Sequence, residues 1–213
     1  MTPIEKRLRD NFPAIQMTLV SLIVALVFET LIGKMIDFEG AWLSSPEGFL
    51  FLSQCVFVAI VSLMYWFTLS LQSASIKVVF SPRHALSPIL PGVIFFALVS
   101  TIGGNGLILW LYVCSTLSAA AWLVFGEHER LYIADPDASG KAGTHRVSRL
   151  LMLCCGITIA GSAVLLQYEV VGLLPVGALL WLAVVLAVIA HQFWYAEWKR
   201  AVDINPGPGL GSE

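Results

Sequence analysis

The chain has 213 residues, of which 58% are hydrophobic and 12% are charged, and its formal net charge is -2. Because a soluble domain carries about a quarter charged residues, this composition excludes a water-soluble fold. The near-neutral charge, with basic residues spread over short loops, also disfavours nucleic acid as a direct partner. We therefore expect an integral membrane protein that has the lipid bilayer as its main partner.

Apolar segments of about the length of a bilayer follow one another along the chain. A helix needs about 20 apolar residues to cross roughly 30 Å of hydrocarbon. The sequence therefore predicts an all-α, polytopic transmembrane helical bundle, a single domain over residues 1–200, with a disordered cytoplasmic tail over residues 201–213. The third span is the weakest, since Pro88 and Pro91 suit a helix start or a kink. The six predicted spans are residues 14–36, 49–72, 86–103, 105–126, 149–168 and 172–195.

The basic residues set the orientation of this bundle. Of the 12 Lys and Arg residues, only Lys34 lies on the side opposite to both termini. Because positive side chains are retained in the cytoplasm, the pattern predicts six spans with both termini cytoplasmic (N-in, C-in). Trp110 is then expected at the outer membrane interface and Trp194 at the inner one. Short spans, minimal outer loops and the absence of an Asn-x-Ser/Thr sequon favour a bacterial inner membrane.

In the first span, Glu29 places a carboxyl group well inside an apolar segment. Such a group is costly in lipid and usually faces a bundle interior, a partner or water. The residues that share the helix face of Glu29 are small or polar, which is typical of a buried helix contact. Two interpretations stay open. One is a structural glutamate, which fastens helices together or extends outward towards Lys34, and the other is a protonatable or ion-binding site; we favour the structural interpretation. The residues that share the face of Glu29 at helical spacing are Thr18, Ser21, Ala25 and Gly33.

The second span carries a polar face of its own. Gln54, Tyr65, Thr68 and Gln72 point within about 60° of one another at the helical 100° per residue. We expect this face to avoid lipid, and we favour packing against other helices over the lining of an aqueous path. Gln54 reaches a depth similar to that of Glu29, so the two side chains are predicted to be able to form a hydrogen bond.

The fourth and fifth spans carry small residues four positions apart, Ser115 with Ala119 and Gly156 with Ala160. Small residues let helix backbones approach closely, so these pairs predict tight contacts. Before them, residues 101–106 faintly resemble a potassium-filter signature, in which carbonyl oxygens coordinate the ion. A re-entrant pore helix there would break the segregation of the basic residues, so we interpret these residues as a glycine-rich hairpin turn.

No metal site or cofactor is predicted. Residues 135–140 resemble the start of a calcium-binding loop, but Arg146 stands where the bidentate glutamate belongs. There is no His-Glu-x-x-His motif, no P-loop and no nucleophile elbow. All four cysteines are expected to be small buried hydrophobes without disulfides. The four histidines, expected at or beyond the cytoplasmic boundary, are His84, His128, His145 and His191.

Three functional hypotheses follow. We favour a non-enzymatic, homo-oligomeric membrane subunit that acts as an anchor, sensor or scaffold for a cytoplasmic protein. The second is a small ion channel or transporter that uses Glu29 and the polar face of the second span. The third, ranked last, is a lipid-modifying enzyme around Glu127, His128, Glu129 and His145. The basic residues proposed to contact a cytoplasmic partner are Lys77, Arg83, Arg130, Lys141, Arg146 and Arg149.

Overall fold

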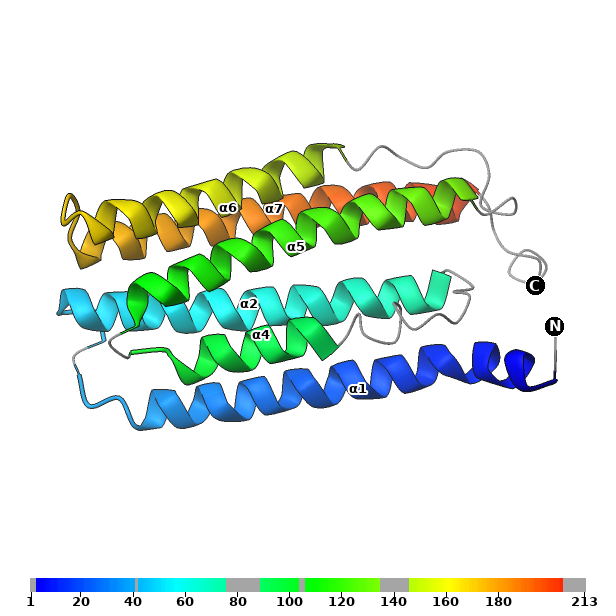
Figure 1. Cartoon of the computed structure of the whole chain (residues 1–213), viewed down its shortest axis with the longest axis horizontal. Coiled ribbons are helices and arrows are strands. Elements are labelled where there is room, and N and C mark those ends of the chain that lie inside the picture. Colours follow the sequence, from blue (N-terminus) through cyan, green and yellow to red (C-terminus); the bar gives the residue numbers. More distant parts are fainter. Residues whose placement is uncertain (1–2, 41, 76–88, 104–105, 135–145, 205–213) are drawn as a thin grey trace.

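A computed structural model describes residues 3–40, 42–75, 89–103, 106–134 and 146–204 of the chain. These residues form helices and no strand, which confirms the all-α class. The helices run roughly side by side along the long axis of the molecule (Figure 1). They are α1 (Pro3–Ile36), α2 (Pro46–Ser75), α4 (Ile89–Ser100), α5 (Leu107–Ala134), α6 (Arg146–Gln167) and α7 (Leu173–Ile204).

Long apolar helices identify the chain as a membrane protein. Of the described helices, four contain a segment that is long and apolar enough to cross a bilayer. α5 is 28 residues long, and its apolar part is Leu107–Leu123. The orientation and the count of six spans remain predictions. The four long segments are Ala14–Ile36, Pro46–Leu71, Arg146–Gln167 and Leu173–Glu197.

The third predicted span is described from residue 89 onwards. There α4 covers 12 residues and is followed by a turn. Pro91 lies in the first described turn of this helix. At the other end of the chain α7 continues to Ile204, so residues 201–204 are helical where we expected a disordered tail.

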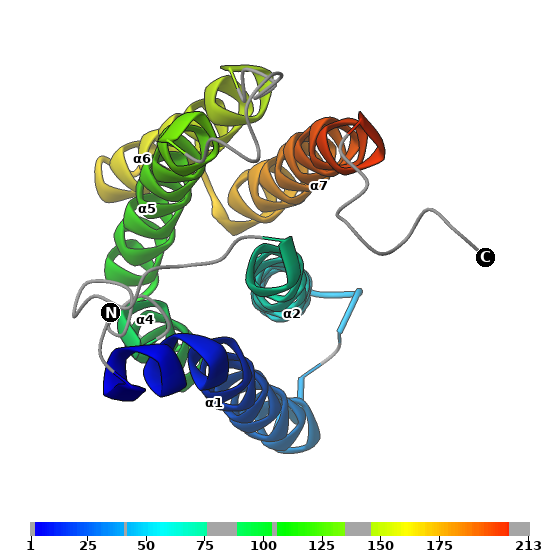
Figure 2. The same ribbon diagram turned by 90° about the vertical axis from the view of Figure 1, so that its right-hand side faces the viewer.

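The helices form a ring with one helix outside it. Within the ring α2 contacts α7, α7 contacts α6, α6 contacts α5, α5 contacts α4, and α4 contacts α2. α1 packs against α2 and α4 from the outside. Viewed from one end, α1 and α6 lie on opposite sides of the molecule, and α2 lies between α1 and α7 (Figure 2). One face of α1 is therefore held by the bundle, and the other is turned away from it.

Glycine residues allow three of these helix pairs to approach closely. An added Cβ would lie 2.8 Å from the Ile23 side chain at Gly92, 3.3 Å from Ser118 Cβ at Gly156, and 2.7 Å from the Phe49 ring at Gly177. These positions join α4 to α1, α6 to α5 and α7 to α2.

The small residues of the fourth and fifth predicted spans predicted tight helix contacts without identifying the partner helix, and two of them, Ser115 and Gly156, contact each other. Ser115 Oγ donates a hydrogen bond to the Gly156 carbonyl at 3.1 Å. Ala119, which shares the four-residue spacing with Ser115, is exposed instead of packed.

One end of the bundle is closed by aromatic rings and by the turn after α4. Phe38 stacks on Phe51 with ring centroids 4.1 Å apart, and Trp42 meets both rings edge-on. Gly103 adopts a left-handed conformation, with φ of 71°, which glycine tolerates without strain. The expected glycine-rich turn is thus present over residues 101–103. It is a turn between two packed helices, as expected in place of an ion filter.

Trp110 and Trp194 are buried side chains of the bundle, each 1% exposed. Trp110 Nε1 donates a hydrogen bond to the Leu98 carbonyl at 2.9 Å, which ties α5 to α4. Their depth relative to the membrane interfaces stays a prediction.

Candidate functional site

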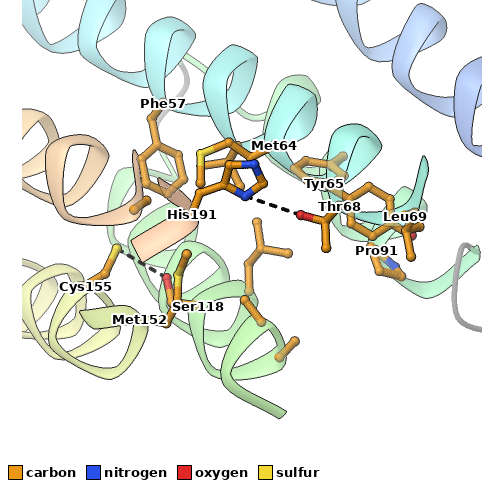
Figure 3. Close-up of a pocket in the computed structure, with 16 residues that line it drawn as sticks. Phe57, Met64, Tyr65, Thr68, Leu69, Pro91, Ser118, Met152, Cys155 and His191 are labelled. Carbon is orange, nitrogen blue, oxygen red and sulfur yellow. Dashed lines mark hydrogen bonds between the residues drawn. The ribbon is translucent and has the colours of Figure 1, made fainter. Parts of the chain in front are cut away.

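A cavity lies inside the ring of helices (Figure 3). Its volume is about 100 Å³, and its wall is almost entirely apolar. All helices of the ring contribute to it, whereas α1 does not. The hydroxyl, imidazole and thiol groups at its wall are the only polar side chains among the described residues that line it: Tyr65 and Thr68 from α2, Ser118 from α5, Cys155 from α6 and His191 from α7.

His191 and Thr68 form a polar pair across the interface of α2 and α7. The distance between Thr68 Oγ1 and His191 Nδ1 is 3.4 Å, and the two side chains are 7% and 8% exposed. Phe67 meets the imidazole edge-on and Trp194 stacks on it, each with centroids 5.5 Å away. The imidazole therefore contacts two aromatic rings. One of its nitrogens is directed to Thr68 (Figure 3).

On the facing wall, Ser118 and Cys155 form a second polar pair. Ser118 Oγ donates to Cys155 Sγ at 3.6 Å and to the Cys114 carbonyl at 3.3 Å. Cys155 Sγ lies 3.5 Å from the Ala183 carbonyl. These contacts use the hydrogens of both the hydroxyl and the thiol, so this pair has little hydrogen-bonding capacity left. A thiol that is buried and bonded in this way is a packing group and not a nucleophile.

A groove on the outside of the bundle adjoins the cavity. It lies between α2 and α7 and encloses about 410 Å³. Met64 and His191 line both the groove and the cavity, so they form the boundary between them. Leu63 and Phe67, which also line the groove, are exposed on the outer surface.

The polar face of α2 is buried, as expected, but it is divided between two places. Tyr65 and Thr68 reach the cavity. Gln54, 3% exposed, lies toward the other end of α2, where its Oε1 is 3.4 Å from the Gly103 backbone N–H. Gln54 thus supports the turn after α4. The side chain of Gln72 lies outside the described residues.

Glu29 is not covered by the other helices of the chain. Its side chain is exposed, as are Thr18, Ser21 and Ala25 of the same face. The buried face of α1 is the opposite one, with Val20, Val27 and Leu31 as examples. Within the described residues Glu29 has no hydrogen bond or ion pair, so the suggested bond to the buried Gln54 is absent there.

The proposed partner-binding basic residues are described only in part. Lys77, Arg83 and Lys141 lie outside the described residues, and so does the side chain of Arg130. Arg146 is exposed at the start of α6. Arg149 lies with Cζ 4.6 Å from the centre of the Trp122 ring, a cation–π contact that fastens α6 to α5.

Residues proposed for metal or enzymatic sites are also described in part. Residues 135–140, His84 and His145 lie outside the described residues, as do the side chains of residues 127–129. In the described part of the chain, no group of three or more His, Cys, Asp or Glu side chains is placed to hold a metal ion. Three cysteines are buried as expected, but Cys154 is exposed on the outer face of α6.

His191 is the residue that sequence reasoning misplaced. We expected it at the membrane boundary because Glu197, Lys199 and Arg200 follow closely. A signal for its burial was present in the helical spacing, which puts it on one face with Ala187 and Trp194. Comparison of the chain with protein-family models, curated proteins and solved structures finds no match. The function is therefore inferred from the geometry of the side chains described above.

Proposed function

We propose that the protein is a non-enzymatic membrane subunit that self-associates through the outer face of α1. The observation that carries this proposal is the exposure of Glu29 within Ala14–Ile36, an apolar segment of membrane-spanning length. A carboxyl group turned to hydrocarbon is costly, and intramembrane acids face a bundle interior, a partner or water. Because the bundle of one chain does not cover Glu29, a neighbouring chain is the simplest way to remove it from lipid.

The residues around Glu29 suit a helix contact. Ala25 and Gly33 lie one turn before and one turn after it, and both are small. At Gly33 an added Cβ would have no atom within 4 Å, so this part of the surface is open to another helix. Small residues allow close backbone approach, and a polar side chain in such a contact contributes about 1–2 kcal/mol.

A second copy is the partner that this face fits best. A two-fold contact places the same patch of both copies together. Parallel copies of α1 then bring the two Glu29 side chains to the same depth, where a protonated carboxyl can donate to the other. Ser21 supplies a hydroxyl on the same face, and it already accepts a hydrogen bond from Trp66 Nε1 at 3.0 Å.

The assembled subunit would present its basic loops to a cytoplasmic protein, as an anchor or scaffold, with its termini in the cytoplasm of a bacterial cell. The charge segregation along the sequence supports this orientation. Arg146, exposed at the start of α6, is the described basic residue best placed for such a contact. Arg149 already contacts the Trp122 ring, so it is less suited to binding a cytoplasmic protein.

A channel within one chain has less support. Glu29 lies on the outside of α1, whereas Thr68 and Tyr65 line the cavity on the other side of α2. These groups therefore border no common path in the part of the chain that the structure describes. The cavity wall is also apolar, which suits neither water nor ions.

Disulfide cross-linking in native membranes tests the proposed contact. Ala25→Cys is made in a Cys154→Ala background, because Cys154 is the one exposed cysteine among the described residues. Mild oxidation is expected to yield a covalent dimer. The wild-type chain is the matched control, since its Cys154 lies on α6, on the opposite side of the molecule (Figure 2).

Two results would count against the proposal. One is a failure of Ala25→Cys to cross-link in a chain that is expressed and inserted normally. The other is equal cross-linking through Cys154, which would indicate random collision in the membrane.

A further inference from the structure

We propose that the cavity between α2, α4, α5, α6 and α7 binds the neutral carbonyl end of a lipophilic molecule, whose hydrocarbon part lies in the adjoining groove. Three features of the molecule support this proposal. They are the chemistry of the cavity wall, the hydrogen-bonding capacity of His191 and Thr68, and the volumes of the cavity and the groove. It does not depend on self-association through α1, because α1 contributes no residue to the cavity.

The cavity wall selects for a neutral, mainly apolar group. Its described lining residues include no Lys, Arg, Asp or Glu. Transfer of an ion into such surroundings carries a large desolvation cost with no opposite charge to offset it. Aliphatic and aromatic side chains such as Phe57, Phe95 and Met152 make up most of the surface. A charged headgroup is therefore excluded from this space.

The pair of His191 and Thr68 adds one hydrogen-bond donor to that wall. If Nδ1 of the imidazole accepts from the Thr68 hydroxyl, then Nε2 carries a hydrogen. If Nδ1 carries the hydrogen and donates to Thr68, then the hydroxyl hydrogen is left to donate elsewhere. In both tautomers one donor remains after the 3.4 Å contact between the two side chains has been made.

A carbonyl oxygen is the group that complements this donor. Within the described residues neither side chain has another hydrogen-bond partner, so this donor is available to a ligand. A hydrocarbon in the cavity would make no use of the donor. A ketone or ester oxygen would accept its hydrogen bond without introducing a charge.

The volumes fit the end of a molecule and not a whole lipid. The cavity, at about 100 Å³, is smaller than the roughly 150 Å³ apolar cavity that admits benzene. The groove beyond Met64 and His191 encloses about 410 Å³ and opens beside the exposed side chain of Leu63. A chain attached to the carbonyl can therefore leave the cavity along α2 and α7 and reach the lipid phase.

Binding of tritiated 2-undecanone to the full chain in lipid nanodiscs tests this assignment, with empty nanodiscs as the background. We expect saturable binding. Unlabelled undecane should compete about fivefold more weakly than unlabelled ketone, which is the contribution of one neutral hydrogen bond. Methyl decanoate should also compete, and its strength relative to the ketone identifies an ester or a ketone as the preferred source of the carbonyl.

Matched variants separate the site from the fold. Ala121 lines the cavity and Ala119, on the same helix, is exposed. Ala121→Phe should abolish saturable binding, whereas Ala119→Phe should bind like the wild type. The double variant Thr68→Val/His191→Phe, which removes both possible donors, should bind ketone and undecane equally. The proposal is overturned if no saturable binding occurs, if undecane competes as well as the ketone in the wild type, or if Ala121→Phe still binds.

Discussion

Gly177→Ala perturbs the contact between α7 and α2, which forms one wall of the cavity. A Cβ at this position would lie 2.7 Å from two ring carbons of Phe49 and 3.3 Å from Ser53 Oγ. Carbon atoms do not approach so closely, so the Phe49 ring must move or the helices must separate. Such overpacking costs about 1–3 kcal/mol. Alanine is favoured over glycine in a helix by about 1 kcal/mol, so the net loss of unfolding free energy should be up to about 2 kcal/mol.

Gly161→Ala is the matched control for this substitution. Gly161 lies within α6, and an added Cβ there has no atom within 4 Å. The same change should therefore raise the free energy of unfolding by up to about 1 kcal/mol. Adding Phe49→Leu to Gly177→Ala should restore part of the loss, because it removes the ring that the new methyl group meets.

Unfolding by sodium dodecyl sulfate in mixed micelles, followed by far-ultraviolet circular dichroism, measures these differences. From most to least stable, the expected order is Gly161→Ala, wild type and Gly177→Ala. The reasoning is refuted if Gly177→Ala is as stable as Gly161→Ala, because α7 and α2 would then not approach each other as closely as the structure shows.

Trp110→Phe removes the hydrogen bond from the indole N–H to the buried Leu98 carbonyl. It should lower the free energy of unfolding by about 1–3 kcal/mol, and an unchanged value in the same assay would show that this bond does not hold α4 to α5. The predicted orientation is tested with cysteines at the exposed positions Glu169 and Lys199 in a Cys154→Ala background. A membrane-impermeant maleimide should label Glu169→Cys in sealed cells and Lys199→Cys only after permeabilisation, and the reverse pattern would invert the proposed topology.

Helix positions were predictable from the sequence because long apolar runs leave few other choices in lipid. The predicted spans over residues 14–36 and 49–72 lie within α1 and α2, although α1 begins at Pro3, well before the predicted start. The spacing of small residues indicated tight contacts at Ser115 and Gly156, but it did not show that these two residues contact each other.

The inward face of α1 could not be chosen from the sequence. Helical spacing correctly groups Glu29 with Ala25 and Ser21, but it does not say which side the bundle covers. In a soluble protein, polarity separates the two sides. In a membrane, lipid is as apolar as a protein interior, so exposed Leu22 and buried Val27 carry the same signal. For this reason the sequence does not show whether a helix contact at Glu29 lies within one chain or between two.

Only one residue of the polar pair in the cavity was predicted from the sequence. Thr68 was identified because it shares a face with Tyr65 and Gln54. Its partner His191 is 123 positions away along the chain. No local pattern reports which residue of α7 lies opposite Thr68 of α2, because that register is set by packing at positions such as Gly177.

Self-association of the chain in liposomes, measured by fluorescence energy transfer between labelled copies at a series of dilutions, tests the account most directly. The wild type should dimerise, and Glu29→Leu should weaken the dimer by about 5- to 30-fold, which corresponds to about 1–2 kcal/mol. Ile157→Ala, a change at an exposed apolar position of α6 on the opposite side of the molecule (Figure 2), should have little effect on the dimer. A wild-type chain that is monomeric at all densities, or a Glu29→Leu dimer as tight as the wild type, would contradict the proposed role of α1.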